Sequence, residues 1–355
     1  MKFLIAFGVI ALMVGGFLFV KGPSPAIIIA PEHIFDIGPL VVTNTMFTSW
    51  CVVAILCTVA VIAGSSMSVV PHGFSGAVEA VVSGFYGIIV GVAGEANGRR
   101  FFWVIATIFF YVLASNYFGL LPMNNVFGRV EVGHGDKQVI FKEATIAGMK
   151  VAYIPINPEE CEGAACPSYR APVDGRGAAP AKAGETTMAA AKPAEHAEPI
   201  QYSGLISPAF RSVNTDVNAP LAIAIFSFIF VEYWGLTALG PSYLKKFFNF
   251  GALMRGKPMG IIDVFVGLLE FVSELSRMVS FTFRLFGNIF AGEVLLMMMS
   301  FLVPFVLVDI FFGLELFVGL VQAFVFAMLT LVFAQTAVSH HGGDDHGEAH
   351  GEGHH

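Results

Sequence analysis

The stretch RLFGNIFAGEVLL, residues 284–296, places polar and charged side chains inside an apolar part of the chain. Arg284 opens the run, Asn288 follows one helical turn later, and Glu293 lies near its end. Burying an unpaired guanidinium in lipid costs at least a few kcal/mol. A sequence that keeps an arginine here must therefore neutralise the charge locally or use it.

The composition indicates a chain that is solvated mainly by lipid. Of its 355 residues, 56% are hydrophobic and only 13% are charged, whereas about a quarter of the residues in a soluble protein carry a charge. We therefore predict an all-α polytopic membrane protein with the lipid bilayer as its main surrounding. The net charge of −7 lies largely in one loop and in the tail, and nothing suggests a nucleic acid partner.

Long apolar runs with few or no charges predict the membrane spans, since about 20 apolar residues cross a bilayer as a helix. These runs cover residues 3–20, 45–63, 101–122, 219–240 and 260–338. The fourth run contains one acid, Glu232. The fifth is too long for one crossing, and it predicts a hairpin of two long helices joined near Pro304 to Asp309.

Basic residues in short loops favour the cytoplasmic side and so predict the orientation. Arg99 and Arg100 precede the third run, and four Lys and Arg residues between 245 and 257 follow the fourth. Both clusters are expected to be cytoplasmic, which places the long loop 124–217 outside. Residues 1–25 are either a signal peptide or a retained hydrophobic anchor, and both alternatives leave this topology unchanged.

The glycine-rich residues 72–98 are expected to lie along the cytoplasmic surface or to pack against other helices. The chain then divides into six parts: 1–25, the first membrane helices 26–123, the external loop 124–217, a membrane helix with a basic loop 218–259, the helix hairpin 260–338 and the tail 339–355.

The external loop contains GAAPAKAGETTMAAAKPAEHAEP, residues 177–199, whose composition indicates a flexible insert without a core. Cys161 and Cys166 also lie in the loop, and on an oxidising side of the membrane they are a candidate disulfide. Their spacing alone does not decide it. We expect the His-rich residues 339–355 to be a solvated, disordered tail, and we expect no metal and no cofactor.

Motifs of soluble catalysis are missing from the sequence. It contains no G-x-x-x-x-G-K-[ST] phosphate loop and no G-x-G-x-x-G fingerprint. It contains no G-x-S-x-G elbow and no H-E-x-x-H zinc helix either. If the chain takes part in nucleotide chemistry, the nucleotide binds elsewhere.

The ionisable residues of 260–338 are functional candidates, because lipid penalises such groups heavily. With about 100° per residue, one helix face carries a polar stripe, whereas Glu293 points about 180° away from Arg284. The residues of the stripe are Glu270, Ser273, Arg277, Ser280, Arg284 and Asn288.

The two arginines of this helix differ in whether an acid on the same helix can compensate their charge. Glu274 and Arg277 are spaced i, i+3 and are expected to pair. Arg284 lies about 10 Å further along the axis and has no acid at i±3 or i±4. We therefore expect its charge to be balanced by a carboxylate on another chain.

The final helix adds a second polar face. Glu315 and Gln322 are seven residues apart and so share one side of the helix. We expect them to meet Glu293 and Asn288 across the hairpin, forming a polar pocket that opens outward.

Two of these segments resemble subunit a of the rotary F-type ATP synthase. The segments are SFTFRLFGNIFAGEVLL and GLVQAFVFAMLTLVF, and NYFGLLP at 116–122 resembles the end of the family's second helix. The likeness extends through most of residues 31–340 except the long insert. It implies a long tilted helix hairpin that faces a ring of c proteolipid subunits.

The resemblance also implies roles for individual residues. Arg284 matches the family's essential arginine, which faces the proton-carrying carboxylate of the c-ring. Asn288, Glu293 and Gln322 match residues of the proton pathways, whereas the family varies at the positions of Glu270 and Glu315.

In the implied mechanism, protons enter from outside through Glu293, Glu315, Asn288 and Gln322. They leave to the cytoplasm near Glu270, Glu274, Ser273 and Ser280, and Arg284 blocks direct leakage between the two half-channels. The implied partners are the c-ring, b-type stalk subunits and the F1 sector. The implied location is a bacterial plasma membrane, with an energy-transducing organelle membrane as the alternative.

Two other classes of membrane protein fit the sequence less well. A secondary transporter also keeps charges at mid-membrane, but inverted repeats or broken helices in matching halves are expected there, and none is visible. A passive anchoring subunit does not need an unpaired arginine deep in a span.

Overall fold

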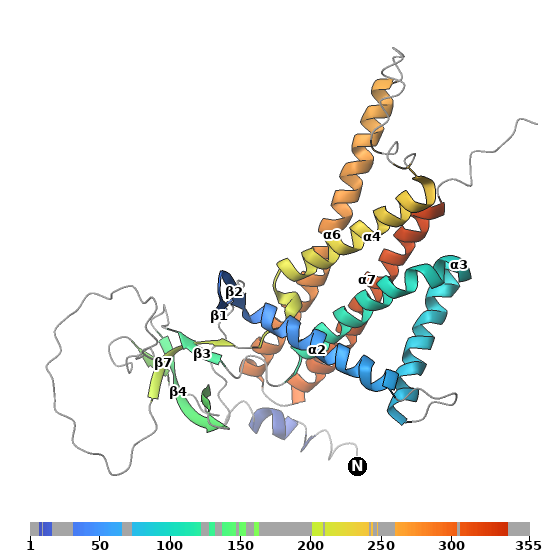
Figure 1. The fold of residues 1–355 in the computed structure, drawn as a ribbon. Helices are drawn as coiled ribbons and strands as arrows, with labels where there is room; N and C mark the ends of the chain where they lie inside the picture. The colour runs from blue at the N-terminus through green and yellow to red at the C-terminus, as the bar shows by residue number, and fades with distance from the viewer. Residues whose placement is uncertain are drawn as a thin grey trace, which may run out of the picture.

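The computed structural model describes residues 7–8, 10–15, 31–65, 73–121, 210–240, 243, 247, 260–303 and 306–339, together with the backbone of five strands between 128 and 208. Within these residues, five helices are long and apolar enough to cross a membrane (Figure 1). They are α2 (Asn44–Ser65), α3 (Gly73–Gly119), α4 (Asn218–Leu239), α6 (Gly260–Leu302) and α7 (Val306–Ser339). The prediction of an all-α membrane part is confirmed.

The predicted hairpin of long helices is present as α6 and α7. Residues 303–305 separate the two helices, next to the expected joint at Pro304. The 43 residues of α6 span about 65 Å at 1.5 Å per residue. Since the hydrocarbon core is about 30 Å thick, α6 must tilt or extend beyond it.

Helix α3 contains two legs joined by a bend at Gly94. This residue has φ 75° and ψ 166°, a backbone conformation that glycine adopts without steric cost. The legs pack on each other near the bend, where the rings of Phe85 and Phe109 stack at 4.3 Å. The first leg contains residues 73–94, most of the glycine-rich segment 72–98, and it packs against the second leg, while its placement along the cytoplasmic surface remains a prediction.

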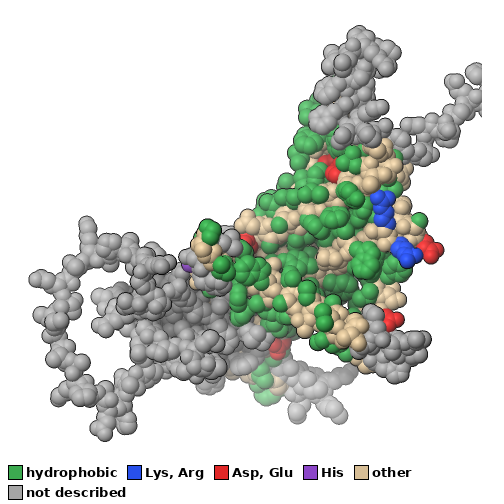
Figure 2. Space-filling model, in the orientation of Figure 1, with side chains coloured by type: hydrophobic (Ala, Val, Ile, Leu, Met, Phe, Trp, Pro, Cys, Tyr) green, Lys and Arg blue, Asp and Glu red, His purple; other side chains and the backbone are tan. Residues whose placement is uncertain are grey.

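The core lies where α3, α4, α6 and α7 meet. Helix α7 contributes a buried stripe at positions 319, 323, 327, 330 and 334, the i, i+3, i+4 spacing of one helix face. Gly319 and three alanines in this stripe allow close approach of the neighbouring backbones, which is the usual basis of helix packing in membranes. Many large hydrophobic side chains are exposed on the helices. On the face shown in Figure 2, the few Lys and Arg side chains gather beside the bend of α3.

Strands precede and follow the first helices. Strands β1 (His33–Ile37) and β2 (Leu40–Thr43) form an antiparallel hairpin directly before α2. A five-stranded antiparallel sheet follows α3, with the order β5-β3-β7-β4-β6 and an additional β5–β4 pairing. Its strands are β3 (Gly128–Glu131), β4 (Lys137–Ile146), β5 (Met149–Tyr153), β6 (Glu160–Glu162) and β7 (Gln201–Pro208).

The sequence patterns of the external loop do not predict this sheet. The strands flank residues 177–199, the expected flexible insert, which lie outside the described residues. Strand β7 leads directly into the segment before α4, and the carbonyl of Pro208 accepts a hydrogen bond of 3.3 Å from the Asn44 side chain. The sheet is therefore tied to the start of α2 (Figure 1).

Candidate functional site in the helix bundle

Four of the six residues predicted to share a polar stripe on α6 are exposed, whereas Glu270 and Arg277 are partly buried. Ser273, Ser280, Arg284 and Asn288 are all exposed, whereas Leu285 between them is fully buried. Arg284 forms no ion pair with any residue that the structure describes, and its guanidinium carbon lies 5.9 Å from the Phe281 ring centroid. Among the described residues, its charge is therefore not neutralised by an acid.

The second arginine of α6 is compensated within the helix, as expected. Nη1 of Arg277 donates a hydrogen bond of 2.7 Å to Oε2 of Glu274, a short, charge-assisted contact. The guanidinium carbon of Arg277 also lies 3.8 Å from the centroid of the Phe333 ring of α7. The pair is consequently directed into the bundle.

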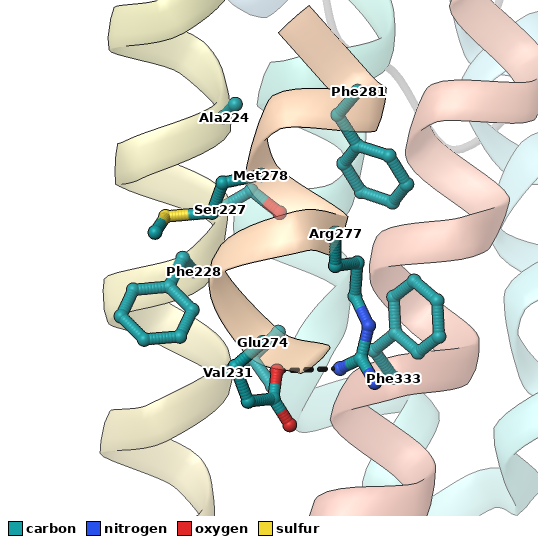
Figure 3. Close-up of a pocket in the computed structure, with 9 residues that line it drawn as sticks. All are labelled: Ala224, Ser227, Phe228, Val231, Glu274, Arg277, Met278, Phe281 and Phe333. Atoms are coloured by element: carbon teal, nitrogen blue, oxygen red, sulfur yellow. Dashed lines mark hydrogen bonds and ion pairs between the residues drawn. The ribbon is translucent and has the colours of Figure 1, made fainter. Parts of the chain in front are cut away.

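This pair borders a small cavity between α4, α6 and α7 (Figure 3). The cavity measures about 20 Å³, which is room for about one water molecule. Its lining is mostly apolar, with Ser227 on the α4 side. The Ser227 hydroxyl lies 2.8 Å from that of Thr330 and so forms a hydrogen bond between α4 and α7.

A second acid, Glu232 of α4, lies near this end of the bundle. Tyr243, in the segment after α4, donates a hydrogen bond of 3.3 Å to Glu232. Burial, followed by the negative charge of Glu232, raises the pKa of the Tyr243 phenol, so that it stays a neutral donor near pH 7. Glu270, the remaining candidate at this end, is half-buried.

The second polar face, on α7, meets α6 as predicted at one point. Nδ2 of Asn288 donates a hydrogen bond of 2.8 Å to Oε1 of Gln322. Glu315 is 7% exposed and lies against Gly292, where an added Cβ would collide with its carboxyl group. The carboxyl group of Glu315 therefore lies beside Gly292, the chain neighbour of Glu293, where the glycine leaves room for it.

Glu293 itself pairs with a residue that sequence reasoning missed. Oε1 of Glu293 lies 3.7 Å from Nε of Arg211, which is 4% exposed and precedes the short helix η2 (Val213–Thr215). The run Arg211–Asp216 is buried throughout and contacts α2, α3, α4 and α6. Its polar sequence, RSVNTD, resembles a solvated loop, and only the tertiary packing shows that it is buried.

Hydrogen bonds from this segment reach three helices. Thr45 of α2 donates to Oδ2 of Asp216 at 3.0 Å. Asn214 donates to Oδ1 of Asn116 at 2.7 Å, and Asn116 in turn donates to the carbonyl of Gly319 in α7 at 3.0 Å. These hydrogen bonds tie the segment that contains Arg211 to α2 and α3, and Asn116 ties α3 to α7.

The candidate disulfide remains a prediction. Cys161 lies in β6, whereas Cys166 lies outside the described residues. The His-rich tail after residue 339 also lies outside them.

Five long apolar helices among the described residues define a multi-pass α-helical membrane protein, and its bundle contains buried charged groups. Comparison with known families gives a sharper result. The family model "ATP synthase A chain" matches residues 46–335. The chain belongs to this family and is a subunit a of the proton-translocating ATP synthase, within its Fo sector.

Similar proteins come from bacteria and carry the name ATP synthase subunit a. That of Nitratidesulfovibrio vulgaris is 25% identical over 303 residues, covering 85% of this chain and 89% of that protein. That of Syntrophobacter fumaroxidans is 21% identical over 314 residues, covering 88% and 92%. That of Aliarcobacter butzleri is 35% identical over 130 residues, covering 36% and 53%.

Proposed function

We propose that Arg284 is the cation against which the proton-carrying carboxylates of a c-ring pass. The observation that carries this proposal is the exposure of Arg284 on the polar stripe of α6 without an ion pair among the described residues. A carboxylate of the ring is attracted while ionised and released when protonated. The neutral site then rotates through lipid, which an ionised site cannot do cheaply.

Two half-channels reach Arg284 from opposite sides in this proposal. Glu293, Glu315, Asn288 and Gln322 form the external one, and the Asn288–Gln322 hydrogen bond supports their grouping. Glu270, Glu274, Ser273 and Ser280 form the cytoplasmic one. Glu274 takes part there through its pair with Arg277, which holds the carboxylate beside the small cavity.

The driving force follows from the charge moved. Each proton that moves down the membrane potential releases about 2.3 kcal/mol of free energy per 100 mV. Several protons per turn of the ring then supply the work for ATP synthesis on F1. The proposed partners are the c-ring, b-type stalk subunits and F1, and the proposed location is a bacterial plasma membrane.

Cysteine cross-linking in the assembled complex tests the ring-facing surface. In a chain whose native cysteines are replaced, Ser280→Cys and Asn288→Cys should each form a disulfide with a cysteine placed near the ring carboxylate. Ile229→Cys is the matched control, because it is 56% exposed but lies on α4. Cross-linking at position 229 and none at 280 or 288 would overturn the proposed orientation.

A further inference from the structure

Arg211 stands out because a buried guanidinium at the end of a membrane bundle is costly unless it is compensated. Its side chain is 4% exposed, and its Nε lies 3.7 Å from Oε1 of Glu293. Glu293 points away from Arg284 on α6, so Arg284 does not serve as its counter-charge. Arg211 is thus the cation that the structure places beside the external-pathway acid.

The position of Arg211 is imposed by contacts that do not involve Glu293. Its backbone N–H donates to the Thr48 hydroxyl of α2 at 3.3 Å, and that hydroxyl donates to the carbonyl of Asn44 at 2.8 Å. The next residue, Ser212, lies against Gly119 at the end of α3, where no Cβ fits. These contacts hold the backbone at Arg211 in place independently of Glu293.

The charges around Glu293 explain why a cation is needed there. Glu315 of α7 lies against Gly292, so two carboxyl groups approach this part of the hairpin. Asp216, five residues after Arg211, is a third acid in this region. Its carboxylate oxygens already accept hydrogen bonds from Thr45 and Asn218. A guanidinium facing Glu293 offsets the cost of keeping that carboxylate charged in a poorly solvated part of the bundle.

The two arginine–acid pairs among the described residues differ in the distance between their charged groups. Arg277 and Glu274 approach to 2.7 Å, and the Glu274 side chain is 4% exposed. The 3.7 Å between Nε of Arg211 and Oε1 of Glu293 exceeds the range of a direct hydrogen bond. The Glu293 side chain is also 17% exposed, so it is compensated and still reachable.

From this geometry we propose that Arg211 is a positioning residue of the external half-channel, which orients the Glu293 carboxylate and balances its charge during proton entry. The inference deepens the proposed function and rests on the role assigned there to Glu293. Arg211 acts through Glu293 and does not itself carry the proton. The segment Arg211–Asp216 is accordingly part of the pathway wall.

The test uses the complete ATP synthase in inverted membrane vesicles, with passive proton conduction measured after removal of F1. Arg211→Gln should lower conduction roughly tenfold or more, because a buried pair loses one partner. Arg211→Lys keeps the charge and should retain most of the conduction. Arg100→Gln, which removes an exposed arginine of α3, is the control and should conduct like the wild type.

A double variant separates positioning from a merely structural role. If Arg211 acts through Glu293, Arg211→Gln should cause no further loss in a Glu293→Gln background, since residues that act as a unit are not additive. Full additivity, or equal defects in Arg211→Lys and Arg211→Gln, would overturn the proposal. Normal conduction in Glu293→Gln would instead show that the proposed pathway is wrong.

The amount of subunit a in the membrane is measured in every variant by immunoblot. If Arg211→Gln fails to accumulate, the exchange Arg211→Glu with Glu293→Arg becomes the deciding variant. Recovery of the subunit to near wild-type amounts supports a direct pair between the two positions. Failure to recover while Glu293→Arg alone accumulates normally would refute the pairing.

Discussion

Helix α6 contributes to two arginine–acid pairs that are built in different ways. Arg284 lies between them on the helix and has no ion-pair partner among the described residues. Arg277 finds Glu274 one turn away on its own helix. Glu293 finds Arg211 in a segment far away in the sequence. The same helix thus carries one cation that is satisfied locally and one, Arg284, that no described residue satisfies.

We expect this difference to distinguish a structural arginine, Arg277, from a functional one, Arg284. Arg277 is directed into the bundle by Glu274 and by the Phe333 ring. Arg284 points outward on a polar face. Residue type and membrane depth are therefore poor guides to function by themselves, and the location of the counter-charge is a better one.

The largest expected effect comes from the arginine without a partner. Arg284→Ala should abolish proton-driven ATP synthesis in membrane vesicles, because no cation would then meet the ring carboxylate. Its stability cost should stay within about 1 kcal/mol, as for substitutions of exposed side chains without buried contacts. Loss of the assembled complex, seen by native electrophoresis, would instead identify Arg284 as a structural residue.

Breaking the local pair should have an intermediate effect. Arg277→Met leaves Glu274, which is 3% exposed, buried without its cation, and this should cost roughly 2 kcal/mol or more. The methionine still packs on Phe333, so the loss reports the charge and not the packing. Thermal unfolding of the detergent-solubilised complex measures it.

The matched control is the double variant Glu274→Leu/Arg277→Met. Replacing both members of a buried pair by apolar residues is often neutral for stability, so the midpoint of unfolding should return toward that of the wild type. A double variant as unstable as Arg277→Met alone would show that the pair does not explain the effect.

Local patterns made the helices and one pair predictable. The i, i+3 spacing of Glu274 and Arg277 and the 100° periodicity around Arg284 depend on a single helix, and both are observed. The Asn288–Gln322 contact required only that two adjacent helices form a hairpin. Each of these inferences needed only the regular geometry of an α-helix and the order of the helices along the chain.

Contacts between distant segments were not predictable in this way. RSVNTD at 211–216 is polar, and only the surrounding helices bury it. The five strands between 128 and 208 also pair across large sequence separations, because β7 joins β4 and β3 after the whole insert has intervened. Their register depends on tertiary partners that no single-segment pattern reveals.

The smallest expected effect tests whether the Glu293 end depends on the insert itself. Deleting residues 171–199 removes the low-complexity part but leaves all five strands, including β7, which ends at Pro208 shortly before Arg211. Shortening a flexible loop changes its closure entropy only slightly, so ATP-driven proton pumping should stay close to that of the wild type.

The wider deletion of residues 130–205 cuts into β7 and removes β4, β5 and β6. Because β7 leads into the segment that holds Arg211 beside Glu293, pumping should fall in the wider deletion but not in the shorter one. A complex that assembles normally with the shorter deletion and cannot pump would place the insert within the proton entrance.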